Sequence, residues 1–149
     1  MIINKSKVVI VGAGAVGSST AFSLVTQGVC DEVVLTDINQ EKAIGEAMDL
    51  QHCIEYLNRN VKVRAGTYED CSDADIVVIT ASAPYIQGQN RLDMLGASKK
   101  ILKSIVDPIM KNGFDGIFVV ISNPVDIMSY YIYKLCGLPK NQIIGTGTA

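Results

Sequence analysis

Three glycines follow a short apolar segment near the start of the chain, at Gly12, Gly14 and Gly17, in the spacing G-x-G-x-x-G. This spacing is typical of a turn that lets the backbone approach a diphosphate, because a side chain at the second glycine would obstruct it. A triphosphate-binding loop of the ATPase type needs G-x-x-x-x-G-K-[ST], and no lysine follows these glycines. The spacing therefore predicts a dinucleotide turn, with the phosphates at the amino end of the next helix.

An acidic residue, Asp37, stands twenty residues after Gly17, at the end of a second β-branched run. A carboxylate there can accept hydrogen bonds from both ribose hydroxyls of adenosine. It would also repel a ribose phosphate, which carries about −1.5 to −2 charges. Asn39 is the better-placed residue to cap the helix that follows, which leaves Asp37 for the ribose. We therefore expect NAD rather than NADP as the cofactor.

Short β-branched runs alternate with helical patterns along the chain, and such runs suit strands that are buried on both faces. Alternation of this kind implies right-handed crossovers, with ligands at the carboxyl ends of parallel strands. The predicted fold class is α/β, a Rossmann-type doubly wound parallel sheet with strand order 3-2-1-4-5-6 and helices on both faces. The expected strands are 7–11, 32–36, 61–65, 75–80 and 116–122, and the expected helices are 15–27, 39–57, 92–111 with a kink at Pro108, and 124–135.

The composition favours one globular domain. The 149 residues, 48% of them hydrophobic, can bury one core and are too few for two ordinary domains. The 13 basic and 15 acidic residues are interspersed, which argues against a nucleic-acid partner. No apolar run approaches the ~20 residues that cross a bilayer. The four cysteines are widely separated, with no C-x-x-C pair, so we expect reduced thiols in a cytoplasmic protein that binds no metal and no membrane.

Two further segments follow expected strands and carry polar residues, TASAPYIQGQNRLDML from position 80 and VVISNPVDIMSYY from position 119. Together with GAGAVG, TDI, AMDLQH and IIGTGT, they resemble the amino-terminal half of the L-lactate/malate dehydrogenase family over nearly the whole chain. The resemblance implies hydride transfer between NADH and pyruvate or a related 2-oxo acid in the full-length subunit. Malate and branched 2-hydroxy acid dehydrogenases are the alternatives within the family.

The resemblance assigns the catalytic role to Arg91. In the family, the loop after the fourth strand folds over the substrate, and the arginine at its far end polarises the reacting ketone. A guanidinium in a closed, dry site stabilises the negative charge that hydride arrival places on the carbonyl oxygen. The alternative is a solvated residue at a helix start, where its charge opposes the helix dipole.

Asn123 resembles the family residue that contacts both the substrate and the nicotinamide ribose. An Asn-Pro turn without a ligand is the alternative, but the position at the carboxyl end of a strand favours binding. For Lys42 and Ser104, an ordinary helix-surface position explains the residue equally well. The resemblance gives the cofactor-binding residues as Gly12, Gly14, Val16, Gly17, Asp37, Lys42, Tyr68, Ser82, Ala83, Ser104, Ile121, Ser122, Asn123 and Thr146.

The position that discriminates between substrates falls on Tyr85, six residues before Arg91, where lactate enzymes carry Gln and malate enzymes carry Arg. Malate is disfavoured because tyrosine cannot supply a cation to the second carboxylate. Tyr85 could pack against a larger apolar group of a 2-oxo acid, or Gln87 could take the position if the loop register differs. The default substrate is therefore lactate.

The one histidine, His52, is of the residue type that most often donates a proton in catalysis near neutral pH. By resemblance, however, the catalytic histidine, its aspartate partner and the substrate-gripping arginine lie downstream of this chain, and His52 is structural, on a helix that packs against another subunit. We expect residues 1–149 to be an NAD-binding domain without the catalytic domain, inactive alone, from a subunit that forms a homo-dimer or tetramer. A non-catalytic NAD-binding module and an NAD-dependent glycosidase domain are the rival classes.

Overall fold

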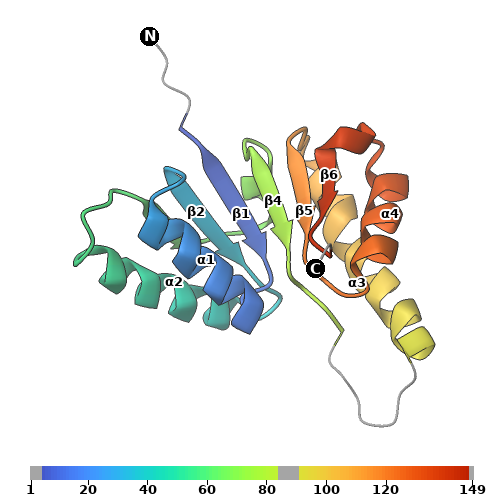
Figure 1. The fold of residues 1–149 in the computed structure, drawn as a ribbon, viewed down its shortest axis with the longest axis horizontal. Coiled ribbons are helices and arrows are strands. Elements are labelled where there is room, and N and C mark those ends of the chain that lie inside the picture. Colours follow the sequence, from blue (N-terminus) through green and yellow to red (C-terminus); the bar gives the residue numbers. More distant parts are fainter. Residues whose placement is uncertain (1–4, 84–90, 148–149) are drawn as a thin grey trace.

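The computed structural model describes residues 5–83 and 91–147, with the backbone alone for 91–94. A parallel sheet of six strands forms its centre, in the order β3-β2-β1-β4-β5-β6, which confirms the predicted order (Figure 1). The strands are β1 (Lys7–Val11), β2 (Glu32–Thr36), β3 (Lys62–Ala65), β4 (Ile76–Ile79), β5 (Ile117–Val120) and β6 (Ile143–Gly145). The helices are α1 (Ala15–Gln27), α2 (Gln40–Ile54), α3 (Arg91–Lys111) and α4 (Val125–Cys136), with short 3-10 helices η1 (Tyr68–Cys71) and η2 (Lys140–Gln142).

The central strand, β1, shows why these runs are apolar at every position. Val9 and Val11 pack into a core with residues of α3 and α4, whereas Val8 and Ile10 pack into a second core with residues of α1 and α2. Successive side chains of a strand point to opposite faces, so a strand covered on both faces must be apolar throughout. Helices therefore cover both faces of the sheet, as predicted.

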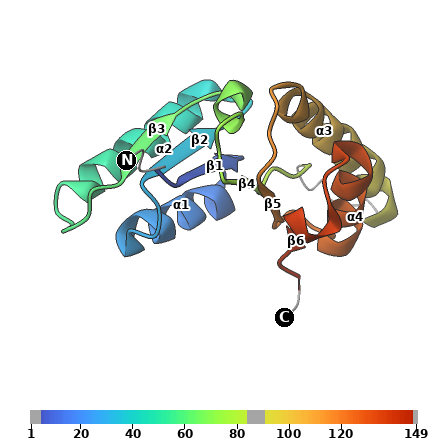
Figure 2. The same cartoon turned by 90° about the horizontal axis from the view of Figure 1, so that it is seen from above.

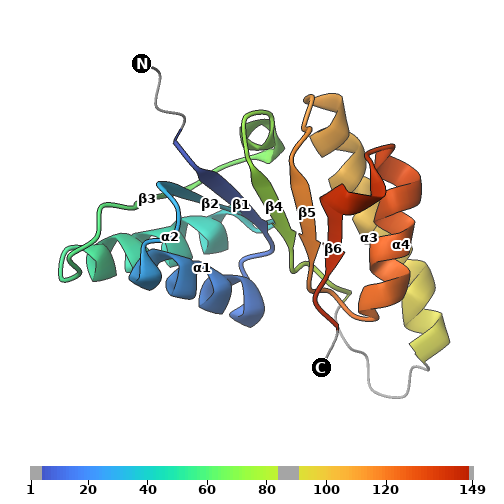
Figure 3. The same cartoon turned by 45° about the horizontal axis from the view of Figure 1, so that its top comes forward.

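The two helix pairs lie at opposite ends of the molecule, α1 and α2 beside β1 to β3, and α3 and α4 beside β4 to β6 (Figure 2). In the tilted view, the strand arrows of β1, β4 and β5 point toward the same edge of the sheet (Figure 3). The strand order reverses between β1 and β4, because β1 is followed by β2 on one side and β4 returns on the other. Ligands of such sheets bind at this reversal, outside the carboxyl ends of the strands.

One predicted helix end differs clearly from the structure, whereas α3 ends where predicted. Helix α2 ends at Ile54 rather than at residue 57, because the next amides, those of Tyr56 and Leu57, donate to carbonyls three residues back and tighten the chain into turns. Helix α3 continues through Pro108 to Lys111. No expectation of η1 was drawn from the sequence, and this short helix is important for the site.

Candidate functional site

The glycine turn leaves β1 at Gly12, whose φ of +109° is a conformation that other residues rarely adopt. A Cβ on Gly12 would lie 2.7 Å from Thr80 Oγ1 and 2.8 Å from the Ala81 amide nitrogen, and one on Gly17 would collide with the carbonyl oxygen of Gly12. A Cβ on Gly14 would meet no atom within 4 Å. Protein packing therefore requires two of the glycines, while the third faces open space.

The amino end of α1 begins at this turn. Gly14 is its N-cap residue and makes no side-chain cap, and the first turn carries no acidic residue. The first amides of an α-helix lack partners within the helix, and they carry the positive end of its dipole. The open space beside Gly14 is therefore suited to a phosphate group.

The carboxylate of Asp37 lies beside the glycine turn and is fixed by two backbone amides. Its Oδ2 accepts a hydrogen bond from Ala13 N at 2.7 Å, and its Oδ1 accepts one from Asn39 N at 2.8 Å. Asn39 caps α2 by accepting from Lys42 N at 3.1 Å, which confirms the predicted cap. A carboxylate has about four lone-pair sites, so Asp37 retains acceptor capacity for a ribose while it holds the turn in place.

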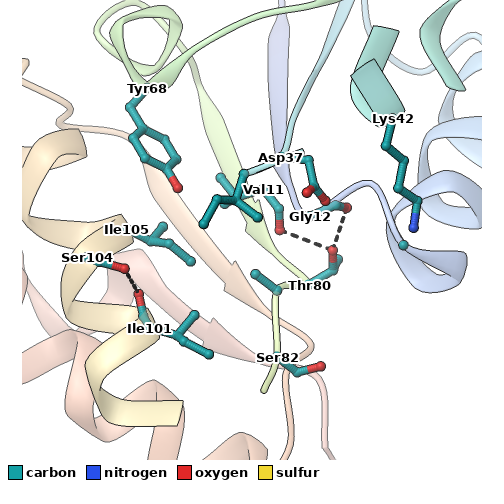
Figure 4. A pocket seen from close by; sticks show the side chains of 13 residues that line it. Val11, Gly12, Asp37, Lys42, Tyr68, Thr80, Ser82, Ile101, Ser104 and Ile105 are labelled. Carbon is teal, nitrogen blue, oxygen red and sulfur yellow. Dashed lines mark hydrogen bonds between the residues drawn. The ribbon is translucent and has the colours of Figure 1, made fainter. Parts of the chain in front are cut away.

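A cavity of about 380 Å³ opens at the carboxyl ends of β1, β2 and β4 (Figure 4). Seven of its thirteen lining residues were assigned to the cofactor from the sequence, and the other six were not. The first set is Gly12, Gly14, Asp37, Lys42, Tyr68, Ser82 and Ser104, and the second is Val11, Ile38, Thr80, Ala81, Ile101 and Ile105. We call these thirteen residues the glycine pocket.

The glycine pocket has a polar side and an apolar side. Gly12, Asp37 and Lys42 lie on one side, and Tyr68, Ile101 and Ile105 lie on the other (Figure 4). Ile38, directly after Asp37, is fully exposed and also lines the cavity. The apolar residue Ile38 directly after Asp37 was a signal that sequence reasoning missed. Ile101 and Ile105 could not be recognised as pocket residues from the sequence, because their spacing is that of any helix packed on a core.

The apolar side includes the phenol of Tyr68. Burial raises its pKa above the usual value, and the neighbouring Cys71 and Asp37 raise the pKa further. The phenol is therefore neutral at physiological pH and keeps its hydrogen. The hydroxyl of Thr80, at the opposite wall, lies 2.9 Å from Gly12 O and 3.1 Å from Val11 O, and so ties the end of β4 to the glycine turn.

The remaining residues assigned to the cofactor lie next to the glycine pocket rather than in it. Val16 and Ile121 share a shallow hollow beside α1. The buried hydroxyl of Ser122 donates to Ala81 O at 2.6 Å, so it joins β5 to the segment after β4. Asn123 is exposed between β5 and α4 and precedes a cis peptide bond. Thr146 is exposed and donates through Oγ1 to Val120 O at 3.2 Å, whereas Ala83 is half-buried after β4.

The residues assigned to the substrate are not brought together by the described part of the chain. Tyr85 and Gln87 lie outside the described residues, and Arg91 begins α3 with a side chain that is also outside them. His52 is exposed in the last turn of α2 and does not line the glycine pocket. Among residues 5–83 and 91–147, no three His, Cys, Asp or Glu side chains are grouped as a metal site would require. No helix within these ranges has the length and apolar composition of a bilayer span.

Comparison with known proteins identifies the family of the chain. Residues 6–145 match the family described as lactate/malate dehydrogenase, NAD binding domain. The chain belongs to this family. Its cofactor is NAD, as predicted, and the family match speaks against the glycosidase alternative.

Similar proteins include L-lactate dehydrogenase 3 of Bacillus cereus (strain ATCC 10987 / NRS 248), 58% identical over 98% of this chain and 46% of the relative. L-lactate dehydrogenase of Lactococcus lactis subsp. cremoris (strain NZ9000) is 52% identical over 99% of this chain and 47% of the relative. The chain thus spans about half the length of the curated relatives it matches.

Solved structures show the same fold. The minor L-lactate dehydrogenase from Enterococcus mundtii, in its ligands-bound form, superimposes with a TM-score of 0.95 at 49% identity, over 98% of this chain and 46% of that one. The apo malate dehydrogenase from Picrophilus torridus gives 0.91 at 31% identity, over 96% and 46%. The lactate enzymes are thus the more similar in sequence.

Proposed function

We propose that this chain, residues 1–149, is the NAD-binding domain of an L-lactate dehydrogenase. The full-length subunit would transfer a hydride between NADH and pyruvate or a related 2-oxo acid. The observation that carries this proposal is the glycine pocket, in which Gly14 faces open space between the amino end of α1 and Asp37. The identity to L-lactate dehydrogenases supports the choice of reaction.

Different residues in and beside the pocket suit different parts of the dinucleotide. The amides at the start of α1 would hold the diphosphate, and Asp37 would accept from the adenosine ribose. Ile38, Tyr68 and Ile101 supply apolar surface for the adenine. Val16, Ile121 and the residues around Asn123 would then lie along the nicotinamide half, on the side of β5.

In the proposed reaction, bound NADH supplies the hydride, and this chain orients the partners. Arg91 would hold the substrate carbonyl and stabilise the charge that develops on its oxygen. Asn123 would position the substrate against the nicotinamide ribose. The proton donor and the substrate carboxylate clamp would come from the other half of the subunit, so this domain alone would bind NAD without turnover.

The proposed partners are a small 2-oxo or 2-hydroxy acid and other copies of the same subunit, in the cytoplasm. Support for self-association comes from Ile44 and Met48, which are 45% and 49% exposed on α2. The interspersed charges and net charge of −2 support the absence of a nucleic-acid partner.

Calorimetric titration of the 149-residue chain with NAD and with NADP tests this proposal. We expect saturable binding of NAD and markedly weaker binding of NADP, because Asp37 would face the additional phosphate. Equal affinities, or no binding of NAD, would overturn the proposal. NADH oxidation with pyruvate by this chain, above a heat-treated control, would overturn the expected lack of turnover.

A further inference from the structure

The residue that brings an aromatic ring to the glycine pocket, Tyr68, opens the short helix η1. Its phenol points into the pocket, on the side of α3 where Ile105 lies (Figure 4). The other end of η1 is anchored by Cys71, which is buried in the core beneath α3 and α4. A helix of a single turn has few internal hydrogen bonds, so its orientation depends on the side chains that fix its ends.

The start of η1 is fixed by a reciprocal cap. The side chain of Thr67 accepts a hydrogen bond from Glu69 N at 3.3 Å, and Oδ2 of Asp70 accepts one from Thr67 N at 2.8 Å. Such a capping box satisfies two backbone amides that the helix itself leaves free. The carboxylate of Asp70 thus determines how the chain enters η1, one residue before Tyr68.

The second oxygen of Asp70 leads away from the pocket to an arginine on β3. Asp70 Oδ1 accepts a charge-assisted hydrogen bond from Arg64 Nη2 at 2.5 Å, and Arg64 Nε donates to Glu32 Oε1 at 2.7 Å. The two carboxylates hold the planar guanidinium from different sides, which a lysine could not reproduce. Arg64 therefore clamps η1 to the first residue of β2.

Further cations complete this arrangement. Lys7 Nζ lies 2.5 Å from Asp73 and 3.8 Å from Asp70 Oδ1, and Lys62 Nζ lies 3.3 Å from Glu32. We call the six residues Lys7, Glu32, Lys62, Arg64, Asp70 and Asp73 the ion-pair cluster. Burial by itself would raise the pKa of Asp70, but the hydrogen bonds from Arg64 and from the Thr67 amide hold that pKa below its usual value.

The backbone next to the cluster is shaped to admit the carboxylate. A Cβ on Gly66 would collide with Asp70 Oδ2 and with Val34 Cγ1. Asp70 can reach both Arg64 and the Thr67 amide only because residue 66 lacks a side chain. The chain from Arg64 to Asp70 therefore forms one continuous clamp.

We propose that Arg64 is a positioning residue for the adenine end of the cofactor, acting through Asp70 and η1 on the ring of Tyr68. Arg64 does not itself line the glycine pocket. The inference rests on the proposed function, since it takes the apolar side of the pocket as the adenine site. Cofactor affinity would then depend on a charge that never touches the cofactor.

A double-mutant cycle tests this inference, with ADP-ribose as the calorimetric probe and Arg64→Ala and Tyr68→Ala combined in the 149-residue chain. We expect Arg64→Ala to weaken binding by about fivefold and Tyr68→Ala by about tenfold, as a lost contact of ordinary strength would. In the Tyr68→Ala background, Arg64→Ala should add less than about twofold, because its effect passes through the ring.

The control is Lys62→Ala, which removes a cation of the same cluster that contacts Glu32 and not Asp70. We expect this variant to bind ADP-ribose as the wild type does. Asp70→Asn is the second variant if Arg64→Ala does not fold, because it keeps an acceptor for the Thr67 amide and loses the charge that holds the guanidinium. Arg64→Lys should give an intermediate affinity.

The outcomes separate the two proposals. Wild-type chain that fails to bind ADP-ribose would overturn the proposed function, and this inference with it. Wild-type binding with fully additive losses in the cycle would overturn the inference alone, as would unchanged affinity in Arg64→Ala or an equal loss in Lys62→Ala.

Discussion

Strands β1 and β2 are followed directly by Gly12 and Asp37, which line the glycine pocket, and they begin with Lys7 and Glu32, which belong to the ion-pair cluster. In the cluster, each charged side chain meets at least one opposite charge within 4.0 Å. In the pocket, Lys42 forms no ion pair with any residue in the described part of the chain.

One sheet thus keeps charges that stabilise the fold at one end of its strands and groups free to bind a ligand at the other end. Ion pairs that are partly buried fix neighbouring elements, because breaking one leaves an uncompensated charge. A ligand site needs the opposite condition, since groups that already have partners gain little from a ligand. Asp37 joins the two conditions, because it holds the glycine turn and still has lone pairs for a ligand.

The largest expected effects belong to two glycines, Gly17 for stability and Gly14 for binding. Gly17→Ala should lower the free energy of unfolding by about 2–4 kcal/mol, because the new methyl group collides with the Gly12 carbonyl. Gly14→Ala should cost at most about 1 kcal/mol, the scale of an N-cap change, but weaken NAD binding by about tenfold or more. Urea unfolding and calorimetry measure the two effects. Equal stability losses in both variants would contradict this assignment of the glycines.

Asp37→Ala removes a carboxylate that holds the glycine turn and is also available to a ligand. We expect NAD affinity to fall by about tenfold or more, since hydrogen bonds to a charged group are worth about 1.5–3 kcal/mol. The preference over NADP should narrow as well, because the repulsion of the second phosphate is lost. Titrations with both cofactors decide the matter, and an unchanged NAD-to-NADP ratio would remove Asp37 from the ribose site.

Acid should weaken the ion-pair cluster. Burial opposes ionisation of Glu32 and Asp70, but hydrogen bonds from Arg64 and other donors lower the pKa of each carboxyl on folding. Their stabilisation is complete above the ordinary values of about 3.9–4.3 and is lost as the pH falls through the lower pKa values of the folded chain.

We therefore expect the free energy of unfolding to drop on acidification below about pH 4, by roughly 1 kcal/mol for each partly exposed carboxyl. Urea unfolding at several pH values measures this, with Asp70→Asn as the comparison. Asp70→Asn should be less stable at neutral pH and should show a shallower loss in acid. Parallel pH profiles for the two proteins would speak against the contribution of Asp70.

The smallest effect belongs to an ion pair outside both regions. Lys103 and Asp107 lie 2.7 Å apart, four residues apart on α3, and both side chains are about half exposed. Lys103→Ala should change the free energy of unfolding only slightly, because exposed pairs are screened by solvent. ADP-ribose affinity should stay at the wild-type value. If Lys103→Ala lowered the free energy of unfolding as much as Asp70→Asn does, partial burial would not make the ion-pair cluster more stabilising than an exposed ion pair.

Much of the fold and the polar side of the pocket could be predicted from the sequence. The glycine spacing, the β-branched runs and the Asn39 cap are local signals, and each depends on residues a few positions apart. The alternation of β-branched runs with helical patterns, together with the glycine turn, led to a Rossmann-type sheet and its strand order. Local patterns thus carried the prediction that Gly14 and Asp37 bind the diphosphate and the adenosine ribose.

The rest depends on contacts between distant residues. Arg64 and Asp70 look like ordinary surface charges until β3 and η1 are folded together, and nothing near Asp37 indicates its bond to Ala13 N. One signal was available, since Thr67 and Asp70 have the spacing of a capping box. Ile101 and Ile105 could not be separated from the core, because one helical stripe serves both the core and the pocket wall.

The reversal of strand order at β1 also affects the order in which the strands of the sheet can pair while the chain is synthesised. Val9 pairs with Val34 across a single helix, whereas its other partner, Val77, is reached only after α1, β2, α2 and β3 have been made. Closing the longer loop costs little more, since each doubling of loop length adds only about 0.6 kcal/mol. The pairing of β1 with β4 is therefore later because the intervening chain must first be synthesised, and not because its free-energy cost is much larger. As the chain leaves the ribosome, β1 can pair with β2, and β2 with β3, before β4 has been synthesised. The half of the domain that carries the glycine turn is therefore the first to fold.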